Sequence, residues 1–157
     1  MSRERAGLLG CGTVGISFLV TLAALSELVL DTEKQKGAVS TLYNWVTAGS
    51  FTLDLSILVD PLSVFMLLIV TGVGFVIHVY SVGYMKEDPE FSRFFAYLNL
   101  FIFAMSVLVL AADFFFLIVG WALVGVASYL LIGFWKEKTS AVLAARKAFV
   151  MNVIGDV

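Results

Sequence analysis

Long apolar runs separated by short polar stretches organise this chain of 157 residues. Its longest apolar run, residues 94–135, contains a single formal charge, Asp113. The apolar spans on either side of that charge are each about twenty residues long, which is enough to cross a hydrocarbon core about 30 Å thick. The pattern predicts two membrane helices joined by a tight turn, at about residues 92–112 and 114–135.

Three other apolar runs predict helices at about residues 7–29, 61–84 and 140–157. The first run follows a short basic start, but it is longer than the apolar region of a signal peptide, about 7–15 residues, so we interpret it as a membrane span. The last run ends before a comfortable crossing is complete. The predicted fold class is an all-α integral membrane protein with about five transmembrane helices, in one domain over residues 1–157.

A different pattern precedes the second predicted helix. Apolar and polar residues alternate at about residues 49–59, and a period of two is typical of a half-buried β segment. We expect an extended or hairpin element lying on the membrane surface, preceded by a solvated loop over the charged residues 31–37. Asp60 stands directly before Pro61, a residue favoured at the first position of a helix, so Asp60 is predicted to cap the second helix.

The composition supports a membrane protein and excludes a soluble enzyme. Hydrophobic residues make up 61% of the chain, charged residues make up 14%, and the mean hydropathy is +1.00. A soluble domain has about 25% charged residues. The net charge of −2 argues neither for nucleic acid nor for an anionic surface as a partner. The single cysteine, Cys11, excludes an internal disulfide and offers no metal cluster, so we interpret it as a small apolar core residue.

The basic residues predict the orientation of the chain in the membrane. With five spans the loops alternate sides, and Lys34 and Lys36 lie on one side. The other side carries eight basic residues: Arg3, Arg5, Lys86, Arg93, Lys136, Lys138, Arg146 and Lys147. By the positive-inside rule the side with eight is cytoplasmic. The amino terminus is then cytoplasmic and the β segment is extracytoplasmic.

Ionisable and polar residues inside predicted spans are the candidate functional residues, because such groups are rare within a bilayer. His78, the only histidine, is expected near the end of its helix beside Tyr80 and Tyr84, within reach of the interface. A neutral, hydrogen-bonded imidazole without a function is the alternative there. In the last predicted helix, Asn152 and Asp156 are four residues apart on one face, and a buried aspartate must face protein or water. Lys147 is placed nearer the interface, in the first turns.

Four runs of the sequence resemble a known family. They are LVDPLSVFMLLIVTGVGFVIHVYSVGYM, FSRFFAYLNLFIFAMSVLVLAADFFFLIVGW, VASYLLIGFW and RKAFVMNVIGDV. In their order and spacing they are similar to the amino-terminal part of subunit L of bacterial NADH-quinone oxidoreductase. This is the antiporter-like subunit of respiratory complex I that corresponds to mitochondrial chain 5. The resemblance covers about residues 45–157, and because the family begins with one further helix, the chain is expected to be shortened at both ends.

The resemblance implies a multi-pass subunit of the bacterial inner (cytoplasmic) membrane that moves protons when quinone reduction elsewhere drives it. It implies no redox centre in this chain, with NAD, FMN, iron–sulfur clusters and quinone bound by partner subunits. The implied partners are the other membrane-arm subunits and the lipid bilayer, and no nucleic acid. The family's proton paths join a glutamate, lysines and polar groups through water. The residues carried over as proton-pathway candidates are Asp156, His78, Lys147 and Asn152.

The chain departs from the family pattern at the glutamate. The family sequence Gly-Trp-Glu-Gly-Val-Gly corresponds to residues 120–125, where Ala122 replaces the glutamate. The family's arginine near the Gly-Asp pair is Val153. We expect Ala122 to face neighbouring protein, on the side of its helix that carries Gly125 and Ser128. The departures leave two alternatives open: a non-conducting structural paralogue or fragment, and the large subunit of a multisubunit Na⁺/H⁺ antiporter, which shares the fold.

Overall fold

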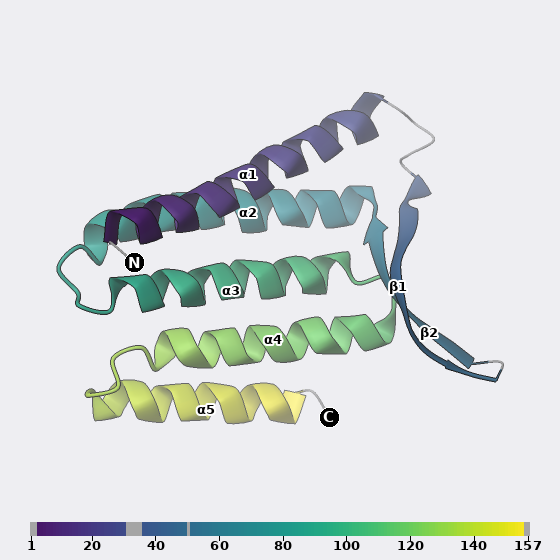
Figure 1. Cartoon of the computed structure of the whole chain (residues 1–157). Coiled ribbons are helices and arrows are strands. Elements are labelled where there is room, and N and C mark those ends of the chain that lie inside the picture. Colours follow the sequence, from purple (N-terminus) through teal and green to yellow (C-terminus); the bar gives the residue numbers. More distant parts are fainter. Residues whose placement is uncertain (1–2, 31–35, 50, 156–157) are drawn as a thin grey trace.

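The computed structural model describes residues 3–30, 36–49 and 51–155, and five helices with one β-hairpin make up this part of the chain (Figure 1). In chain order the elements are α1 (Arg3–Leu30), β1 (Ala38–Ala48), β2 (Phe51–Val59), α2 (Pro61–Tyr84), α3 (Phe91–Leu110), α4 (Phe114–Ile132) and α5 (Thr139–Gly155).

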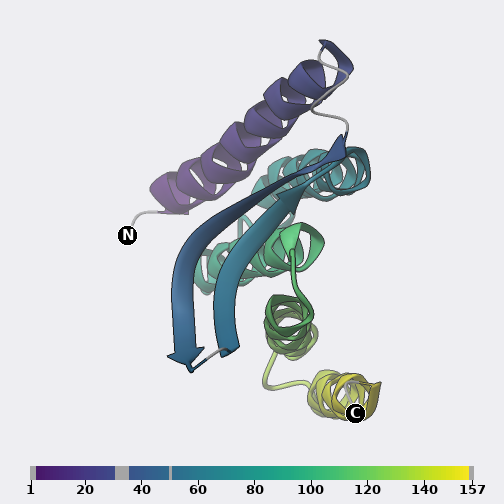
Figure 2. The same ribbon diagram turned by 90° about the vertical axis from the view of Figure 1, so that its right-hand side faces the viewer.

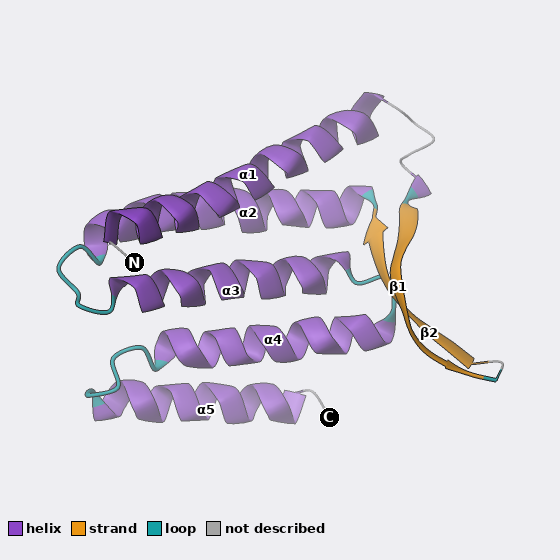
Figure 3. Ribbon diagram, in the orientation of Figure 1, coloured by secondary structure: helices purple, strands orange, loops and turns teal. Residues whose placement is uncertain are grey.

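The helices lie side by side in one layer, each packed against the next in the chain, with α1 crossing over α2 and also contacting α3 (Figures 1 and 2). The strands lie at one end of this layer (Figure 3). The start of α1, the α2–α3 loop and the α4–α5 loop lie at the opposite end. A layer of antiparallel helices with its connections at two ends is the arrangement that alternating membrane spans require.

Four of the described helices, α1 to α4, are long and apolar enough to cross a membrane by length and composition. The structure therefore confirms the predicted class, an all-α membrane protein with a short β element. The fifth helix, α5, has 17 residues and runs alongside α4 up to Gly155.

Two predicted helices end earlier than the apolar pattern suggests. We expected α3 to reach residue 112, but it stops at Leu110 because Ala111 has an extended backbone and pairs with Ile57 of the hairpin. We expected α4 to reach residue 135, but it stops at Ile132, where the backbone N–H of Gly133 donates to the Tyr129 carbonyl. Apolar residues beyond these ends still pack in the protein, so hydropathy alone placed both ends too late.

The hairpin is longer than the predicted β segment at residues 49–59. That prediction covers β2 but misses β1, which pairs with β2 in antiparallel register from Ala38–Val59 to Ala48–Phe51. Two irregularities in the pairing interrupt the alternation along β1, which hides its period of two. Gly49, expected within the segment, forms the turn instead: its φ of +64° belongs to the left-handed region that glycine adopts without strain. Of the predicted solvated loop, residues 31–35 lie outside the described residues.

The hairpin is fastened to the turn between α3 and α4. The backbone N–H of Ala112 donates to the carbonyl of Ser56 at 3.1 Å. The ring of Trp45 on β1 contacts the ring of Phe115 on α4 edge-on, with centroids 5.2 Å apart. The hydrogen bond between Ser56 and Ala112 joins residues 56 positions apart and ties the α3–α4 turn to the hairpin.

The predicted cap of α2 is confirmed. The Asp60 carboxylate accepts from the Ser63 backbone N–H at 2.7 Å, and the Ser63 hydroxyl accepts from the Asp60 N–H at 2.9 Å, with Pro61 beginning the helix. Asp113, the isolated charge of the long apolar run, caps α4 in the same way through the Phe116 N–H at 2.7 Å. Each carboxylate satisfies a backbone donor that has no partner within its own helix.

Glycines set the closest approaches between helices. A Cβ added at Gly120 of α4 would lie 2.7 Å from the Leu108 Cα of α3, and one added at Gly10 of α1 would lie 2.6 Å from the Phe95 ring of α3. The small residue Gly120 of α4 thus packs directly against the α3 backbone. Shape complementarity of this kind holds helices together in lipid, where the apolar tails remove most of the hydrophobic driving force.

Candidate functional site

His78 is the most deeply buried of the predicted site residues. Its side chain is 0% exposed on α2, and the ring lies edge-on against Phe95 of α3 with centroids 5.9 Å apart. We expected it beside Tyr80 and Tyr84 at the interface, but those two side chains are 68% and 60% exposed and stack on each other. His78 points to the interior instead, because α1 and α3 cover that face of α2.

The hydrogen bond of His78 determines which ring nitrogen carries the proton. Nδ1 lies 2.7 Å from the carbonyl oxygen of Gly74, one turn earlier in α2. Since a carbonyl oxygen only accepts, Nδ1 must be the donor, and Nε2 of the neutral ring is left with a free lone pair. Nε2 has no hydrogen-bond partner among the described residues. A buried acceptor without a partner is unfavourable by about 1–3 kcal/mol, so a hydrogen-bond donor placed at Nε2 would stabilise the folded state.

A cavity of about 300 Å³ adjoins His78 between α2 and α3. Apolar side chains line the rest of it, including Ile69, Phe101 and Met105. The Gly74 backbone opens onto the same space. The imidazole is thus the only titratable group in the lining of this cavity within the described part of the chain.

A hydrogen bond between α1 and α3 lies in the same half of the molecule, and sequence reasoning missed it. The Thr13 hydroxyl lies 2.7 Å from Asn99 Oδ1, and Asn99 Nδ2 donates to the Phe95 carbonyl at 2.9 Å. The second bond fixes the orientation of the amide, so the oxygen faces Thr13. Asn99 is the one asparagine between residues 94 and 135, which was an available signal. Amides within membrane helices commonly bond across to a neighbour.

Several hydroxyl groups inside the helices have partners on their own helix. Thr21, Thr71 and Ser106 each donate to the carbonyl four residues earlier, at 2.8, 2.6 and 2.8 Å. This local bonding is the usual solution for a hydroxyl group without water. These three side chains therefore need no further partner, in contrast to Nε2 of His78.

The remaining candidates lie in a different part of the fold. Asn152 of α5 is half-buried, and its side-chain amide packs directly on Gly125 of α4. Lys147 is exposed on α5, and Asp156 lies outside the described residues. Because α5 packs on α4 while His78 lies among α1, α2 and α3, the fold does not bring His78 and Asn152 into one site.

We expected Ala122 to face neighbouring protein, and within the described part of the chain no helix covers it. Its side chain is exposed on α4, whereas Gly125 is buried and Ser128 is half-buried. The expectation placed all three on one face, but the contacts of α4 with α3 and α5 cover Gly125 and leave Ala122 uncovered. Whatever covers this position in the membrane is not among residues 3–30, 36–49 and 51–155.

Arg93 joins two loops at the end of the layer opposite the hairpin. It forms a salt bridge with Glu90, its Nη2 donates to the Phe134 carbonyl at 3.2 Å, and its guanidinium lies 5.0 Å from the centre of the Phe134 ring. Nearby, the Trp135 indole N–H donates to Asp88 at 3.2 Å. These contacts fix the α2–α3 loop to the end of α4 and have a structural role. No group of three or more His, Cys, Asp or Glu that could hold a metal occurs among the described residues.

Four apolar spans with ionisable and amide groups held in their interior define a multi-span helical membrane protein with polar sites inside the bilayer. Two family models match the chain. One is described as the NADH-ubiquinone oxidoreductase (complex I) chain 5 amino terminus and matches residues 45–95. The other, described as the transmembrane region of NADH:quinone oxidoreductase and the Mrp antiporter, matches residues 111–157. The chain belongs to the family of NADH-quinone oxidoreductase subunit L.

Individual relatives agree with this assignment. The chain is 46% identical over 149 residues to the NADH-quinone oxidoreductase subunit L of Mycobacterium tuberculosis, which covers 95% of this chain and 24% of the relative. It is 42% identical over 156 residues to the subunit of the same name from Escherichia coli, covering 99% of this chain and 25% of the relative. It is 43% identical to the subunit of the same name from Pseudomonas aeruginosa, covering 99% of this chain and 25% of the relative. The chain therefore spans about a quarter of the length of these relatives.

Proposed function

We propose that this chain forms the amino-terminal part of a membrane-arm subunit of NADH-quinone oxidoreductase and contributes to proton translocation coupled to quinone reduction. The observation that carries the proposal is the identity of 46% with a protein named as subunit L, over 95% of this chain. In this role the chain holds no redox centre, while NAD, FMN, iron–sulfur clusters and quinone belong to other subunits. Its partners are the other membrane-arm subunits.

His78 is the residue of the described chain best suited to exchange a proton within the membrane. Its Nδ1 is held by Gly74, so the proton would be taken up and released at Nε2, which has no partner among the described residues. The adjoining cavity brings space for water close to His78, although its walls are apolar and Nε2 itself is buried. The other candidates, Lys147 and Asn152 of α5 and Asp156 outside the described residues, are proposed to serve a separate segment of the path.

A test of this role uses two replacements of His78 in the assembled complex. His78→Asn keeps a side-chain donor for the Gly74 carbonyl but removes the exchangeable nitrogen, and His78→Phe fills the same space without any polar atom. We expect both to lower proton uptake by reconstituted vesicles several-fold during quinone reduction. Tyr80→Phe, at an exposed position outside the cavity, is the matched control and is expected to leave uptake unchanged.

Complex assembly has to be measured beside proton uptake. If His78→Asn assembles normally and pumps as well as the unaltered protein, His78 has only a structural role. If only His78→Phe lowers proton uptake, and the complex with this variant does not assemble, then His78 is needed for its hydrogen bond to Gly74 and not for proton exchange.

Two alternatives have support of their own. The second family model includes the Mrp antiporter in its description, so a Na⁺/H⁺ antiporter subunit is the first alternative. The second is a non-conducting paralogue, because the alanine side chain of Ala122 cannot exchange a proton. Purification of the protein from its membrane distinguishes the first: iron–sulfur proteins accompany a complex I subunit, whereas small antiporter subunits accompany the other. Measuring ion flux in reconstituted vesicles tests the second alternative, because a non-conducting paralogue gives no flux.

The proposed location is the bacterial cytoplasmic membrane, with the start of α1 on the cytoplasmic side. The eight basic residues of the larger group lie in α1, at the start of α3, in α5 and in the loops at the end of the layer opposite the hairpin, while Lys36 lies at the hairpin end. This asymmetry is what the positive-inside rule requires of a chain in this orientation.

A further inference from the structure

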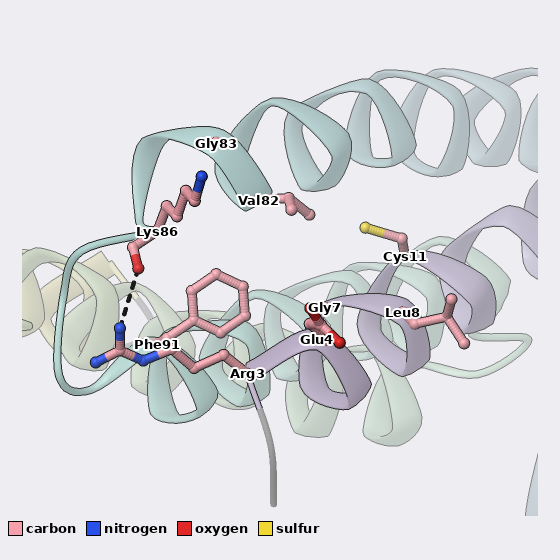
Figure 4. A pocket seen from close by; sticks show the side chains of 9 residues that line it. All are labelled: Arg3, Glu4, Gly7, Leu8, Cys11, Val82, Gly83, Lys86 and Phe91. Carbon is pink, nitrogen blue, oxygen red and sulfur yellow. Dashed lines mark hydrogen bonds between the residues drawn. The ribbon is translucent and has the colours of Figure 1, made fainter.

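A groove of about 700 Å³ opens between the first half of α1 and the end of α2, and Figure 4 shows the side chains that line it. Its floor is the buried ring of Phe91, at the start of α3. Leu8 and Cys11 of α1 and Val82 of α2 form the walls. The groove lies outside the cavity beside His78, because the two share no lining residue.

Two basic residues, Arg3 and Lys86, line one end of the groove. Arg3 donates to the backbone carbonyl of Lys86 at 3.2 Å, which holds the guanidinium beside the start of the Lys86 side chain (Figure 4). No salt bridge joins either cation to a carboxylate among the described residues. Glu4 also lines the groove, and in Figure 4 its carboxylate lies on the far side of the Phe91 ring from this pair. The lining therefore carries one positive charge in excess, and neither cation forms a salt bridge within the described part of the chain.

The groove runs from this charged mouth toward the middle of the membrane layer. From Arg3 to Cys11 is eight residues of helix, which corresponds to about 12 Å along α1. The mouth lies at the end of the molecule where the basic residues gather, and the apolar walls extend inward from it. A charged end at headgroup level with an apolar continuation matches the shape and polarity of a phospholipid.

Glycine keeps the groove open. A Cβ added at Gly83, on the α2 wall, would meet no atom within 4 Å. Gly7, on the opposite wall, would carry a Cβ 3.3 Å from the Phe91 ring, so this glycine allows the ring to form the floor. A larger residue at Gly83 would project into the space without disturbing the packing of the helices.

We propose that this groove binds an anionic phospholipid of the bilayer, with the phosphate at Arg3 and Lys86 and one acyl chain between α1 and α2. Charge complementarity favours this occupant, because a zwitterionic lipid presents the same phosphate with a compensating cation. The net charge of −2 gave no indication of an anionic partner, because it sums over the whole chain and does not show that Arg3 and Lys86 line one groove. The fold brings together two basic residues that are 83 positions apart.

The test measures lipid binding to the purified, delipidated protein by native mass spectrometry. The probe is an equal mixture of phosphatidylglycerol and phosphatidylcholine with identical acyl chains. We expect the unaltered protein to retain phosphatidylglycerol preferentially. The double variant Arg3→Gln/Lys86→Gln is expected to lose that preference by more than about tenfold, since each basic residue near an anionic lipid contributes a factor of about five.

Two glycine variants test the contribution of the groove itself, with both basic residues unchanged. Gly83→Leu fills the groove and is expected to remove retention of phosphatidylglycerol. Gly12→Leu is the matched control, because Gly12 is an exposed helical glycine of α1 that also has no atom within 4 Å of an added Cβ but does not line the groove. It is expected to leave retention unchanged.

Three results would overturn the proposal. The first is equal retention of the two lipids, or of neither, by the unaltered protein, as when another protein segment fills the groove. The second is a preference for phosphatidylglycerol that survives Arg3→Gln/Lys86→Gln. The third is retention that Gly83→Leu does not change. None of these measurements depends on proton transport.

Discussion

At the scale of single residues, the packing of the helices depends on glycines at close contacts and on a few buried polar side chains. Gly120 and Gly10 have no side chain where a neighbouring helix comes closest, and His78 is buried with one nitrogen unpartnered. These three positions matter for the same reason. The four membrane-span helices have apolar surfaces all round, so apolar contacts alone favour no single way of packing them. Close backbone contact and a few polar groups then decide which faces meet.

Replacing Gly120 with alanine is predicted to destabilise the helical layer by about 1–3 kcal/mol. The added Cβ would lie 2.7 Å from the Leu108 Cα and 2.8 Å from its backbone N, and backbone atoms cannot turn aside as a flexible side chain can. The measurement is reversible unfolding in mixed detergent micelles. Gly12→Ala is the control, since its Cβ meets nothing within 4 Å and a helical alanine is favoured over glycine. Equal stability of the two variants would mean that α3 and α4 separate freely at this point.

At the scale of single elements, local sequence signals fix where α2 and α4 begin, and a tertiary contact fixes where α3 ends. Asp60 and Asp113 each start a helix by bonding a backbone N–H three residues on. The end of α3, by contrast, is set by the hairpin, because Ala111 and Ala112 bond to β2. A capping residue acts on its neighbours in the chain, whereas the hairpin reaches the turn only after folding.

Asp60→Ala is predicted to lower stability by about 1 kcal/mol, through the loss of the bonds that Asp60 and Ser63 exchange. Asp60→Asn is the matched control, because an asparagine caps about as well and keeps the acceptor oxygen. Thermal unfolding in detergent compares the two. A loss of the same size in Asp60→Asn would assign the effect to the negative charge at the helix end and not to the cap.

The bond between Thr13 and Asn99 is predicted to couple α1 and α3 by about 0.6 kcal/mol, the average for polar contacts between membrane helices. A double-mutant cycle with Thr13→Val and Asn99→Leu measures this coupling, since it removes the pair and each partner in turn. Ser106→Ala is a control, because the Ser106 hydroxyl donates to the Ile102 carbonyl of its own helix. A coupling of zero would show that Thr13 bonds to its own helix in solution, where carbonyls lie 3.0 and 3.1 Å from its hydroxyl.

At the scale of the whole molecule, one end of the helical layer is basic and the other carries the hairpin. Lys36 lies at the hairpin end, just before β1, and Glu87 lies in the loop between α2 and α3 at the basic end. If the layer spans a membrane, these two positions face opposite compartments.

Single cysteines at these positions test the orientation. In a background where Cys11 is replaced by alanine, Lys36→Cys is predicted to react with a membrane-impermeant thiol reagent added outside intact cells. Glu87→Cys is predicted to react only after the membrane is opened. Labelling of both from one side would contradict the arrangement of alternating spans, and the reverse pattern would invert the proposed orientation.

The sequence by itself determined the membrane class, the start of each predicted helix to within a few residues, the cap at Asp60 and the family. These features follow from short-range causes: apolar length, capping residues next to a helix, and motifs continuous along the chain. It also indicated which residues have suitable chemistry, among them His78 and Asn152. It did not predict β1, because the pairing of β1 with β2 is irregular and the alternation is interrupted.

Only the tertiary structure decided which of these residues meet. It buried His78 against Phe95, separated it from Asn152, exposed Ala122, and paired Arg3 with the loop at Lys86. The physical reason is that these helices are apolar on all sides, so their sequence pattern does not indicate which side is turned inward. The facing sides are selected when glycines and polar groups of distant helices fit together, and that fit depends on several segments at once.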